Sequence, residues 1–512
     1  VAGIGVEAGT CVGFYAGKRQ PERAKLTPDA TAFHVIETGE EITYRLLDQR
    51  SAKAAGWLAE QGIEPGDRVS VLCRNRVEFF ELLFACGKLG AILVPLNWRM
   101  PGKELTVLIE DSKPKLLLTG VEDAAAAAEA GALTGLEPLA LDSDYCAGRD
   151  RCKPHTGRDI WPGDETWYLI YTSGTTGNPK GVIQTYQMAL VNYINIGQAI
   201  GLRPGDATLN FLPLFHTAGI NLHTLPVLMS GGLVHVLPGF EPGPMLKLID
   251  QGTLDVFIGV PACYRGLALH ADFEKTDLTR LRHWSCGGAP LADVLVETFA
   301  KHGATVCNGF GMTETGPTAF LVDDASALDK IGSVGRAQQM VEARIAGPDE
   351  QPLGAGETGE IQFRGPGLTP GYWERPEETA KLFTADGWLK SGDLGRFDDD
   401  GYCFIAGRIK EMYISGGENV YPAEVENILD EHPAVQESAV AGMTDEKWGE
   451  VGCAHIILRV NQTASEEELR TWCRERLAAY KVPKYFRFTH ALPRTAAGKV
   501  QKHLLPAPGT AP

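Results

Sequence analysis

Several features are missing from these 512 residues, and each absence removes a class of protein. No stretch reaches 18 uninterrupted apolar residues, so we expect no integral membrane segment. The 11 cysteines include no CxxC pair and no Cys/His group with zinc spacing, which argues against the common zinc modules and fits free thiols in the cytoplasm. The first residues carry no basic leader, so no signal peptide is predicted.

The chain has fewer basic residues than acidic ones. The chain has 48 Lys and Arg against 65 Asp and Glu, which gives a formal net charge of −17. Because neutralising nucleic-acid phosphates requires clustered Lys and Arg, this balance argues against general nucleic-acid binding. A local glycine-rich pocket could still bind a phosphate-bearing ligand.

The chain length and the hydrophobic pattern indicate an α/β protein with more than one domain. A chain of 512 residues is too long to fold around a single hydrophobic core of ordinary size. Apolar spacing predicts helices over 46–61 and 77–89 and buried strands over 68–73, 91–96 and 115–120. This alternation favours parallel sheets with helices on their faces. The alanine run 124–128 predicts a further, surface helix.

A glycine-rich loop with a lysine is the strongest local signal. The string YTSGTTGNPKGV runs from Tyr171 to Val182, after an apolar stretch. Its backbone N–H groups and hydroxyls suit phosphate oxygens, and Lys180 adds a positive charge. It is not a Walker loop, because glycine and not Ser or Thr follows Lys180. The alternative for such a loop is a plain polar connection between a strand and a helix.

Six more motifs follow in order. They are FLPLFHTAG (211–219), SCGGAPL (285–291), NGFGMTETG (308–316), WLKSGDLG (388–395), GRIKEMYISGGENVYPAEVE (407–426) and PRTAAGKVQK (493–502). With these motifs in this order, the chain resembles the adenylate-forming (AMP-binding) superfamily in its acyl- and aryl-CoA ligase branch, and the resemblance runs over nearly the whole chain. The resemblance implies an ATP-dependent carboxylic acid–CoA ligase, which forms an acyl-adenylate and pyrophosphate and then an acyl-CoA and AMP.

The resemblance also implies cofactors and partners. These are ATP, Mg²⁺ and coenzyme A, with a small carboxylic acid as substrate, no nucleic acid, and a monomer or homodimer in the cytoplasm. The main alternative is a stand-alone adenylation enzyme that loads a carrier protein. A luciferase-type oxygenase has no specific support, and a degenerate binding protein is disfavoured because Glu314, Asp393 and Lys499 are all present.

The resemblance assigns roles at the nucleotide. Thr313 is expected at the α-phosphate and Glu314 at the metal, where a carboxylate supplies a hard oxygen. Phe310 stands where the family more often has Tyr, so it can lie against adenine but cannot donate a phenolic hydrogen bond. Asp393 offers two acceptor oxygens to the ribose hydroxyls, with Arg408 as the second contact. The other expected nucleotide- or cofactor-binding residues are Thr172, Ser173, Gly174, Thr175, Thr176, Gly177, Lys180, Gly287, Gly288, Ala289, Pro290, Asn308, Gly309, Gly311, Met312, Lys410, Gly416 and Gly417.

Two lysines and a glycine pair belong to the expected moving part. Lys499 matches the family's catalytic lysine. A cation there would neutralise both the substrate carboxylate and the α-phosphate of ATP, and so lower the barrier to attack of one on the other. Lys410 matches the hinge about which a small domain swings between the two half-reactions. Gly416 and Gly417 would border the thiol tunnel after that swing.

The acyl pocket is predicted around His216, which in similar enzymes lies near the carboxylate; the alternative is a packed core histidine. Amino-acid-activating relatives usually have Asp in this motif, whereas this chain has Phe215, which favours a plain carboxylate. An aromatic, cinnamate-like acid or a medium-chain acid is favoured, partly because residues 212–221 and an expected glycine-rich hairpin after them resemble feruloyl- and coumaroyl-CoA ligases. The expected pocket residues are Phe215, Thr217, Asn221, Leu222, Val260 and Pro317.

The expected fold has two parts. A large α/β N-terminal domain of stacked sheets flanked by helices would cover 1–407. A small mobile α+β domain would cover 408–512, with the hinge near Lys410 and helices over 424–432 and 466–480.

Overall fold

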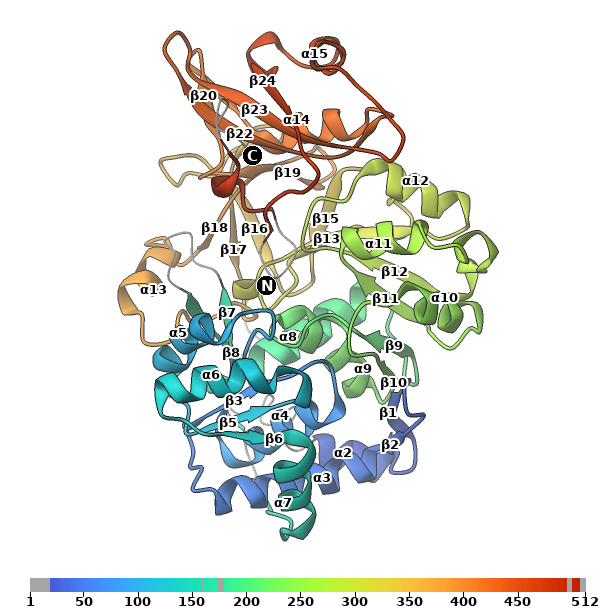
Figure 1. The fold of residues 1–512 in the computed structure, drawn as a ribbon, viewed down its shortest axis with the longest axis vertical. Coiled ribbons are helices and arrows are strands. Elements are labelled where there is room, and N and C mark those ends of the chain that lie inside the picture. The colour runs from blue at the N-terminus through green and yellow to red at the C-terminus, as the bar shows by residue number, and fades with distance from the viewer. Residues whose placement is uncertain (1–18, 159–160, 173–178, 495–499, 507–512) are drawn as a thin grey trace, which may run out of the picture.

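The computed structural model describes residues 19–158, 161–172, 179–494 and 500–506. Over these residues the strands form four sheets, three in a large N-terminal body and one in a smaller C-terminal body (Figure 1). The predicted fold class is confirmed. The helices are α2 (Arg19–Leu26), α3 (Tyr44–Glu60), α4 (Val77–Leu89), α5 (Gly102–Ser112), α6 (Ala124–Thr134), α7 (Cys146–Arg151), α8 (Tyr186–Ala199), α9 (Thr224–Ser230), α10 (Pro242–Asp250), α11 (Pro261–Ala268), α12 (Asp293–Lys301), α13 (Pro376–Leu382), α14 (Pro422–Asp430) and α15 (Glu466–Arg474).

A six-stranded sheet near the N-terminal end of the chain has helices on both faces. Its strands, in spatial order, are β6 (Pro138–Ala140), β5 (Leu116–Thr119), β3 (Arg68–Leu72), β4 (Ile92–Pro95), β7 (Thr166–Thr172) and β8 (Lys180–Thr185). All neighbours are parallel except β7 and β8. Successive residues of β4 take opposite faces, so Leu93 packs with α3 and α4 while Val94 packs with α5 and α6.

Two further sheets complete the large body. The four-stranded sheet is β2 (Glu41–Thr43), β1 (Thr31–Val35), β10 (Leu233–Val236) and β9 (Ala207–Asn210). The nine-stranded sheet is β11 (Val256–Gly259), β12 (His283–Cys286), β13 (Val306–Phe310), β14 (Phe320–Leu321), β15 (Ser333–Ala337), β19 (Cys403–Arg408), β18 (Leu389–Phe397), β17 (Gly359–Arg364) and β16 (Glu342–Ala346). The latter starts as parallel strands and continues as antiparallel ones.

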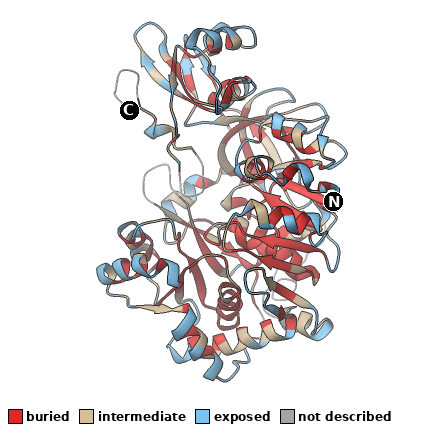
Figure 2. Cartoon of the chain, turned by 45° about the vertical axis from the view of Figure 1, so that its right-hand side comes forward, coloured by how far each residue is buried: buried red, intermediate tan, exposed pale blue. Residues whose placement is uncertain are grey.

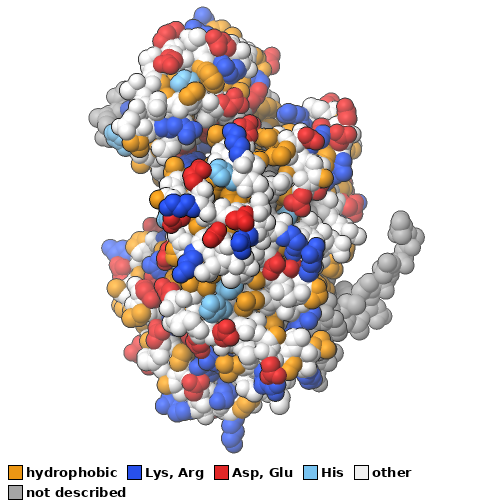
Figure 3. Space-filling model, turned by 90° about the vertical axis from the view of Figure 1, so that its right-hand side faces the viewer, with side chains coloured by type: hydrophobic (Ala, Val, Ile, Leu, Met, Phe, Trp, Pro, Cys, Tyr) orange, Lys and Arg blue, Asp and Glu red, His pale blue; other side chains and the backbone are white. Residues whose placement is uncertain are grey.

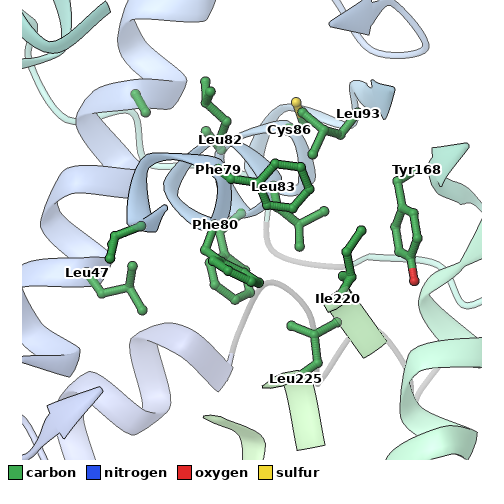
Figure 4. Packing of buried hydrophobic residues seen from close by; sticks show 14 of the residues in the cluster. Leu47, Phe79, Phe80, Leu82, Leu83, Cys86, Leu93, Tyr168, Ile220 and Leu225 are labelled. Carbon is green, nitrogen blue, oxygen red and sulfur yellow. The ribbon is translucent and has the colours of Figure 1, made fainter. Parts of the chain in front are cut away.

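Helix α4 is the centre of the largest core. Its 13 residues match the predicted bounds, and Phe79, Phe80 and Leu83 are at most 1% exposed. Figure 4 shows these side chains between α3 and the segment that carries Ile220 and Leu225. A helix that is apolar all round must be buried, and Figure 2 shows the buried residues concentrated in the sheets and the helices between them.

The C-terminal body has its own sheet, β21 (Glu418–Val420), β20 (Tyr413–Ser415), β23 (Gly449–Leu458) and β22 (Val435–Asp445), with β24 (Tyr485–Phe488) also paired to β23. It contacts the large body through an ion pair between Arg265 of α11 and Glu437 of β22, at 3.6 Å. On the face shown in Figure 3, acidic and basic side chains are interspersed over the described surface.

Two predicted elements are wrong. Helix α15 ends at Arg474, not at residue 480, because its buried positions end with Leu469 and Cys473. The expected hairpin after residue 221 is instead helix α9, followed by Gly231 and Gly232 and then strand β10. In the described ranges, no helix is both long and apolar enough to cross a bilayer.

Candidate active site

The two ends of the glycine-rich loop are fixed by a strand pair. Thr172 ends β7 and Lys180 begins β8, and the two residues are direct partners in the antiparallel register. The predicted residues between them, Ser173, Gly174, Thr175, Thr176 and Gly177, lie outside the described residues. The loop therefore connects two antiparallel strands, whereas the plain alternative assumed a strand and a helix.

Three residues form a row that starts at the first residue of β8: Lys180, Tyr372 and Glu314. The Lys180 Nζ lies 5.0 Å from the centroid of the Tyr372 ring. The Tyr372 hydroxyl donates to Glu314 Oε1 at 2.9 Å. Burial and the Glu314 charge raise the pKa of Tyr372 well above its usual value, so the phenol stays protonated. The structure thus brings the predicted lysine over the face of the Tyr372 ring and the predicted metal-binding carboxylate to its hydroxyl.

The segment 369–373 holds these groups together. Its backbone runs along β8, with Ile183 N–H donating to Gly371 O at 3.1 Å and Trp373 N–H donating to Gly181 O at 2.7 Å. The Thr369 N–H donates to the Glu314 carbonyl at 2.9 Å. Sequence reasoning missed this segment, although its Gly-Tyr-Trp run after two prolines was a visible signal.

Gln184 links β8 to the next predicted block. It is 0% exposed, and its Nε2 donates to the Thr313 carbonyl oxygen at 3.0 Å. A buried amide that donates to a loop carbonyl fixes the direction of that loop. Sequence reasoning also missed Gln184; the signal was a single polar amide within an otherwise buried strand.

The strands β12 and β13 bring the glycine segments 287–290 and 308–312 together. Cys286 pairs with Asn308, and a Cβ on Gly287 would lie 3.2 Å from the Gly309 carbonyl oxygen. Gly288 has φ +83° and lies against Val260, where a Cβ would be 3.6 Å from Cγ1. Ala289 and Pro290 follow on the same connection to α12.

The loop that carries Thr313 and Glu314 requires glycine at its start. A Cβ on Gly311 would lie 1.8 Å from the Pro317 carbonyl oxygen, a separation that no side chain tolerates. Met312 follows and is partly buried against the core of the nine-stranded sheet. Phe310, the predicted adenine neighbour, is partly buried and stacks on Phe363 with ring centroids 6.1 Å apart.

Asp393 and Arg408 are direct partners in the β18–β19 register. The Arg408 Nε lies 3.0 Å from Asp393 Oδ1, and the aspartate side chain is 7% exposed against 47% for the arginine. This ion pair brings the two predicted ribose contacts together at the end of the large body.

The predicted acyl-pocket residues have different surroundings. His216 lies against the Phe215 ring with centroids 4.6 Å apart. Asn221 is 0% exposed and its Nδ2 donates to the Gly316 carbonyl at 2.9 Å. This hydrogen bond fixes the position of the loop that carries Glu314. Thr217 is buried, whereas Leu222 is half-buried at the junction of two core clusters. Pro317 is buried and follows Gly316 directly.

The predicted mobile residues that the structure describes lie in the connection after β19 and in the C-terminal sheet. Gly416 and Gly417 form the turn between β20 and β21, and a Cβ on Gly416 would lie 3.1 Å from the Trp448 ring. Lys410 is exposed between β19 and β20. Lys499 is outside the described residues. On its two sides, Arg494 binds Glu437, and Lys502 binds Glu411 and Glu426 at 3.1 and 2.7 Å.

The residues around Glu314 fit a magnesium ion. The carboxylate is 7% exposed, its Oε1 accepts from Tyr372, and Oε2 accepts from no described residue. Mg²⁺ prefers hard oxygen ligands and is commonly held by one or two carboxylates together with substrate phosphates. The described residues thus include a lysine that follows the glycine-rich loop, a carboxylate suited to a metal ion, and an aspartate paired with an arginine, which are groups that a nucleotide-binding enzyme needs.

Comparison with known proteins identifies the family. The model of the AMP-binding enzyme family matches residues 21–373, and that of the AMP-binding enzyme C-terminal domain matches residues 424–499. The chain belongs to the AMP-binding enzyme family.

Individual relatives agree with this assignment. A feruloyl-CoA synthase of Amycolatopsis sp is 40% identical, over 94% of this chain and 96% of that protein. The long-chain-fatty-acid–CoA ligase FadD13 of Mycobacterium tuberculosis is 35% identical, over 94% and 96%. The o-succinylbenzoate CoA synthetase of Bacillus subtilis, in complex with its acyl-adenylate intermediate, is 31% identical with a TM-score of 0.87, over 95% of this chain and 97% of that one. The same synthetase is also known with ATP and a magnesium ion, at a TM-score of 0.85, 31% identity and coverage of 95% and 98%. The predicted enzyme class, an AMP-forming acid–thiol ligase, is confirmed.

Proposed function

We propose that this protein is an ATP-dependent carboxylic acid–CoA ligase that prefers an aromatic, cinnamate-like acid. The observation that carries the reaction type is the row Lys180–Tyr372–Glu314, which begins at the residue where β8 starts. It sets a cation over the face of one ring and a carboxylate at the hydroxyl of that ring, so that a phosphate group and its counter-ion would each have a group to bind.

Each half-reaction uses groups of this chain. In the first, an oxygen of the substrate carboxylate bonds to the α-phosphorus of ATP, and the bond to pyrophosphate breaks. Lys180 and the loop would hold the phosphates, Thr313 would contact the α-phosphate, and Lys499 would neutralise the two approaching anions. In the second, the CoA sulfur bonds to the acyl carbon, its proton is lost, and AMP leaves.

Bound Mg²⁺ would supply positive charge to the phosphates of ATP. Glu314 would hold that ion, and Tyr372 would orient Glu314 through its hydrogen bond. Asp393 would accept the ribose hydroxyls while its ion pair with Arg408 holds the carboxylate in place. The resulting orientation of the nucleotide is what positions the α-phosphorus for attack.

The substrate class rests on the wall beside His216. Phe215 is 4% exposed and packs edge-on against Trp98, with ring centroids 5.9 Å apart. An aromatic wall without an acidic residue in the motif suits a planar, uncharged acyl group. Feruloyl-CoA synthase, at 40% identity, is a relative whose named product carries such a group. A medium-chain aliphatic acid is the second candidate, since FadD13 acts on fatty acids by name.

The remaining proposals concern the moving parts and the setting. We propose a domain boundary at 407/408 with the hinge at Lys410, because β19 ends at Arg408 and β20 begins at Tyr413 in a different sheet. A cytoplasmic location is supported by the free thiols of the ten cysteines that the structure describes. A monomer or homodimer stays a prediction from the family resemblance.

The experiment is AMP and pyrophosphate release from ATP over a panel of acids, each with and without CoA. Cinnamic, ferulic, benzoic, medium- and long-chain aliphatic acids and amino acids form the panel. Turnover that needs both CoA and a cinnamate-like acid supports the proposal. ATP–pyrophosphate exchange without a CoA ester would instead indicate an adenylation enzyme for a carrier protein, and turnover restricted to aliphatic acids would refute the aromatic preference.

A further inference from the structure

Three residues distant in sequence meet on one face of the nine-stranded sheet. His283 and Ser285 are two apart on β12, so their side chains share a face, and Cys307 of β13 is the direct partner of Ser285. The chain then returns alongside β13, where the Val322 N–H donates to the Asn308 carbonyl at 2.9 Å. This return brings Asp324 beside the side chains of His283 and Cys307.

The three side chains converge on one point. The Cys307 Sγ and the His283 Nδ1 each lie 3.2 Å from Asp324 Oδ1. One ligand atom from each residue lies within 4.8 Å of the other two. In a tetrahedral zinc site with the usual bond lengths, neighbouring ligand atoms are about 3.3–3.6 Å apart. The two distances to Asp324 Oδ1 are therefore within a few tenths of an ångström of those in such a site.

The histidine is already oriented for ligation. Its Nε2 lies 2.8 Å from the Ser285 Oγ, which can accept the ring proton and so fix the tautomer with a lone pair on Nδ1. The residue is 1% exposed, and its Nδ1 faces the Asp324 carboxylate at 3.2 Å. A metal ion that took the place of this direct contact would satisfy both the buried ring nitrogen and the carboxylate oxygen.

We propose that His283, Cys307 and Asp324 form a site for one zinc ion, separate from the Glu314 site. Thiolate, imidazole and carboxylate are ligands that Zn²⁺ accepts in a tetrahedral arrangement. Cys307 loses its thiol proton to solvent when the sulfur binds. The fourth position is left to water on the side of Asp324, whose side chain is 59% exposed and provides the entry path.

At this location the ion would stabilise the strands that lead to the nucleotide site. Cys307 directly precedes the segment 308–312, and His283 lies four residues before Gly287. An ion held between β12, β13 and Asp324 would fasten the strands that present both glycine segments of the nucleotide site (Figure 1). We therefore expect zinc to raise the melting temperature of the protein.

The test is titration of the chelator-treated full chain with Co²⁺, followed by displacement with Zn²⁺. The expected result is one equivalent of cobalt with a thiolate-to-cobalt charge-transfer band, lost on addition of zinc, and a higher Tm with zinc. The variant is Asp324→Asn, which keeps every cysteine and changes only an exposed side chain. It should weaken metal affinity by about tenfold or more and abolish the zinc-dependent rise in Tm.

The matched control is Asp329→Asn, a change of an exposed aspartate on the same segment, which should bind cobalt like the parent. Cys307→Ser should remove the charge-transfer band, and circular dichroism would show whether that buried change still folds. Absence of the band at stoichiometric cobalt overturns the proposal. An equal affinity in Asp324→Asn and the parent would place the ion elsewhere and overturn it as well.

Discussion

Removal of one hydroxyl tests the arrangement around Glu314. In Tyr372→Phe the ring that faces Lys180 stays, but the hydrogen bond to Glu314 Oε1, at 2.9 Å, is lost. The carboxylate is then free to rotate away from the position in which we propose it holds Mg²⁺. Adenylation should suffer more than folding, because the strand contacts of segment 369–373 are made by backbone groups.

The size of the effect follows from the kind of bond. A hydrogen bond to a charged group contributes about 1.5–3 kcal/mol. At about 1.4 kcal/mol per tenfold, that predicts a loss of about 10- to 100-fold in kcat/KM for adenylation. Tyr372 is only half-buried, so water can partly replace its hydroxyl, and the lower end of this range is expected. Half-saturation should also need more Mg²⁺.

The assay is ATP–pyrophosphate exchange with a saturating acid, run at several Mg²⁺ concentrations, with Tm measured in parallel. Tyr402→Phe is the matched control, because the Tyr402 hydroxyl donates to Asp323 at 3.0 Å, outside the proposed site. The control should lose comparable stability and keep its exchange rate. If Tyr372→Phe exchanges pyrophosphate like the parent, Tyr372 does not position Glu314 for catalysis.

Three further substitutions test separate parts of the molecule. Lys499→Ala should abolish adenylation yet leave thiolysis of a supplied acyl-adenylate largely intact, as measured by acyl-CoA formation. Gly311→Ala places a Cβ 1.8 Å from the Pro317 carbonyl oxygen and should abolish adenylation, whereas Gly197→Ala, with no atom near its Cβ, should not; pyrophosphate exchange distinguishes them. Burial raises the pKa of Asp430 to about 7, so the folded state binds a proton more tightly than the unfolded chain and loses stability as pH rises from about 4 to 7. Asp430→Asn should therefore raise Tm at pH 8, with a gain that shrinks as the pH falls through this window.

Each of these has a contrary result. Equal loss of both half-reactions in Lys499→Ala would refute the two-state role of that lysine. Normal exchange by Gly311→Ala would show that the loop shifts at little cost. A gain in Tm for Asp430→Asn that does not depend on pH would mean that ionisation of Asp430 does not destabilise the folded state.

The sequence predicted those elements whose hydrophobic pattern is contained within one short segment. Helix α4 was predicted at its observed bounds because residues 77–89 are mostly apolar at helical spacing, and such a segment must be buried. The length of helix α15 was overestimated because the residues after Arg474 also have helix propensity. Only the packing of the chain decided where the helix ends. The helix α9 was missed because Gly231 and Gly232 gave the signal of a turn between strands.

The amino-acid sequence by itself determined the family, the enzyme class and the order of the motifs, since those motifs are short contiguous strings whose residue types the chemistry requires. Only the tertiary structure decided which groups meet. Tyr372 reaches Glu314 across 58 residues of chain. His283, Cys307 and Asp324 come together although the sequence shows no zinc spacing. The physical reason is that such contacts depend on strand order and register, and β13 lies between β12 and β14 through pairing that no local propensity encodes.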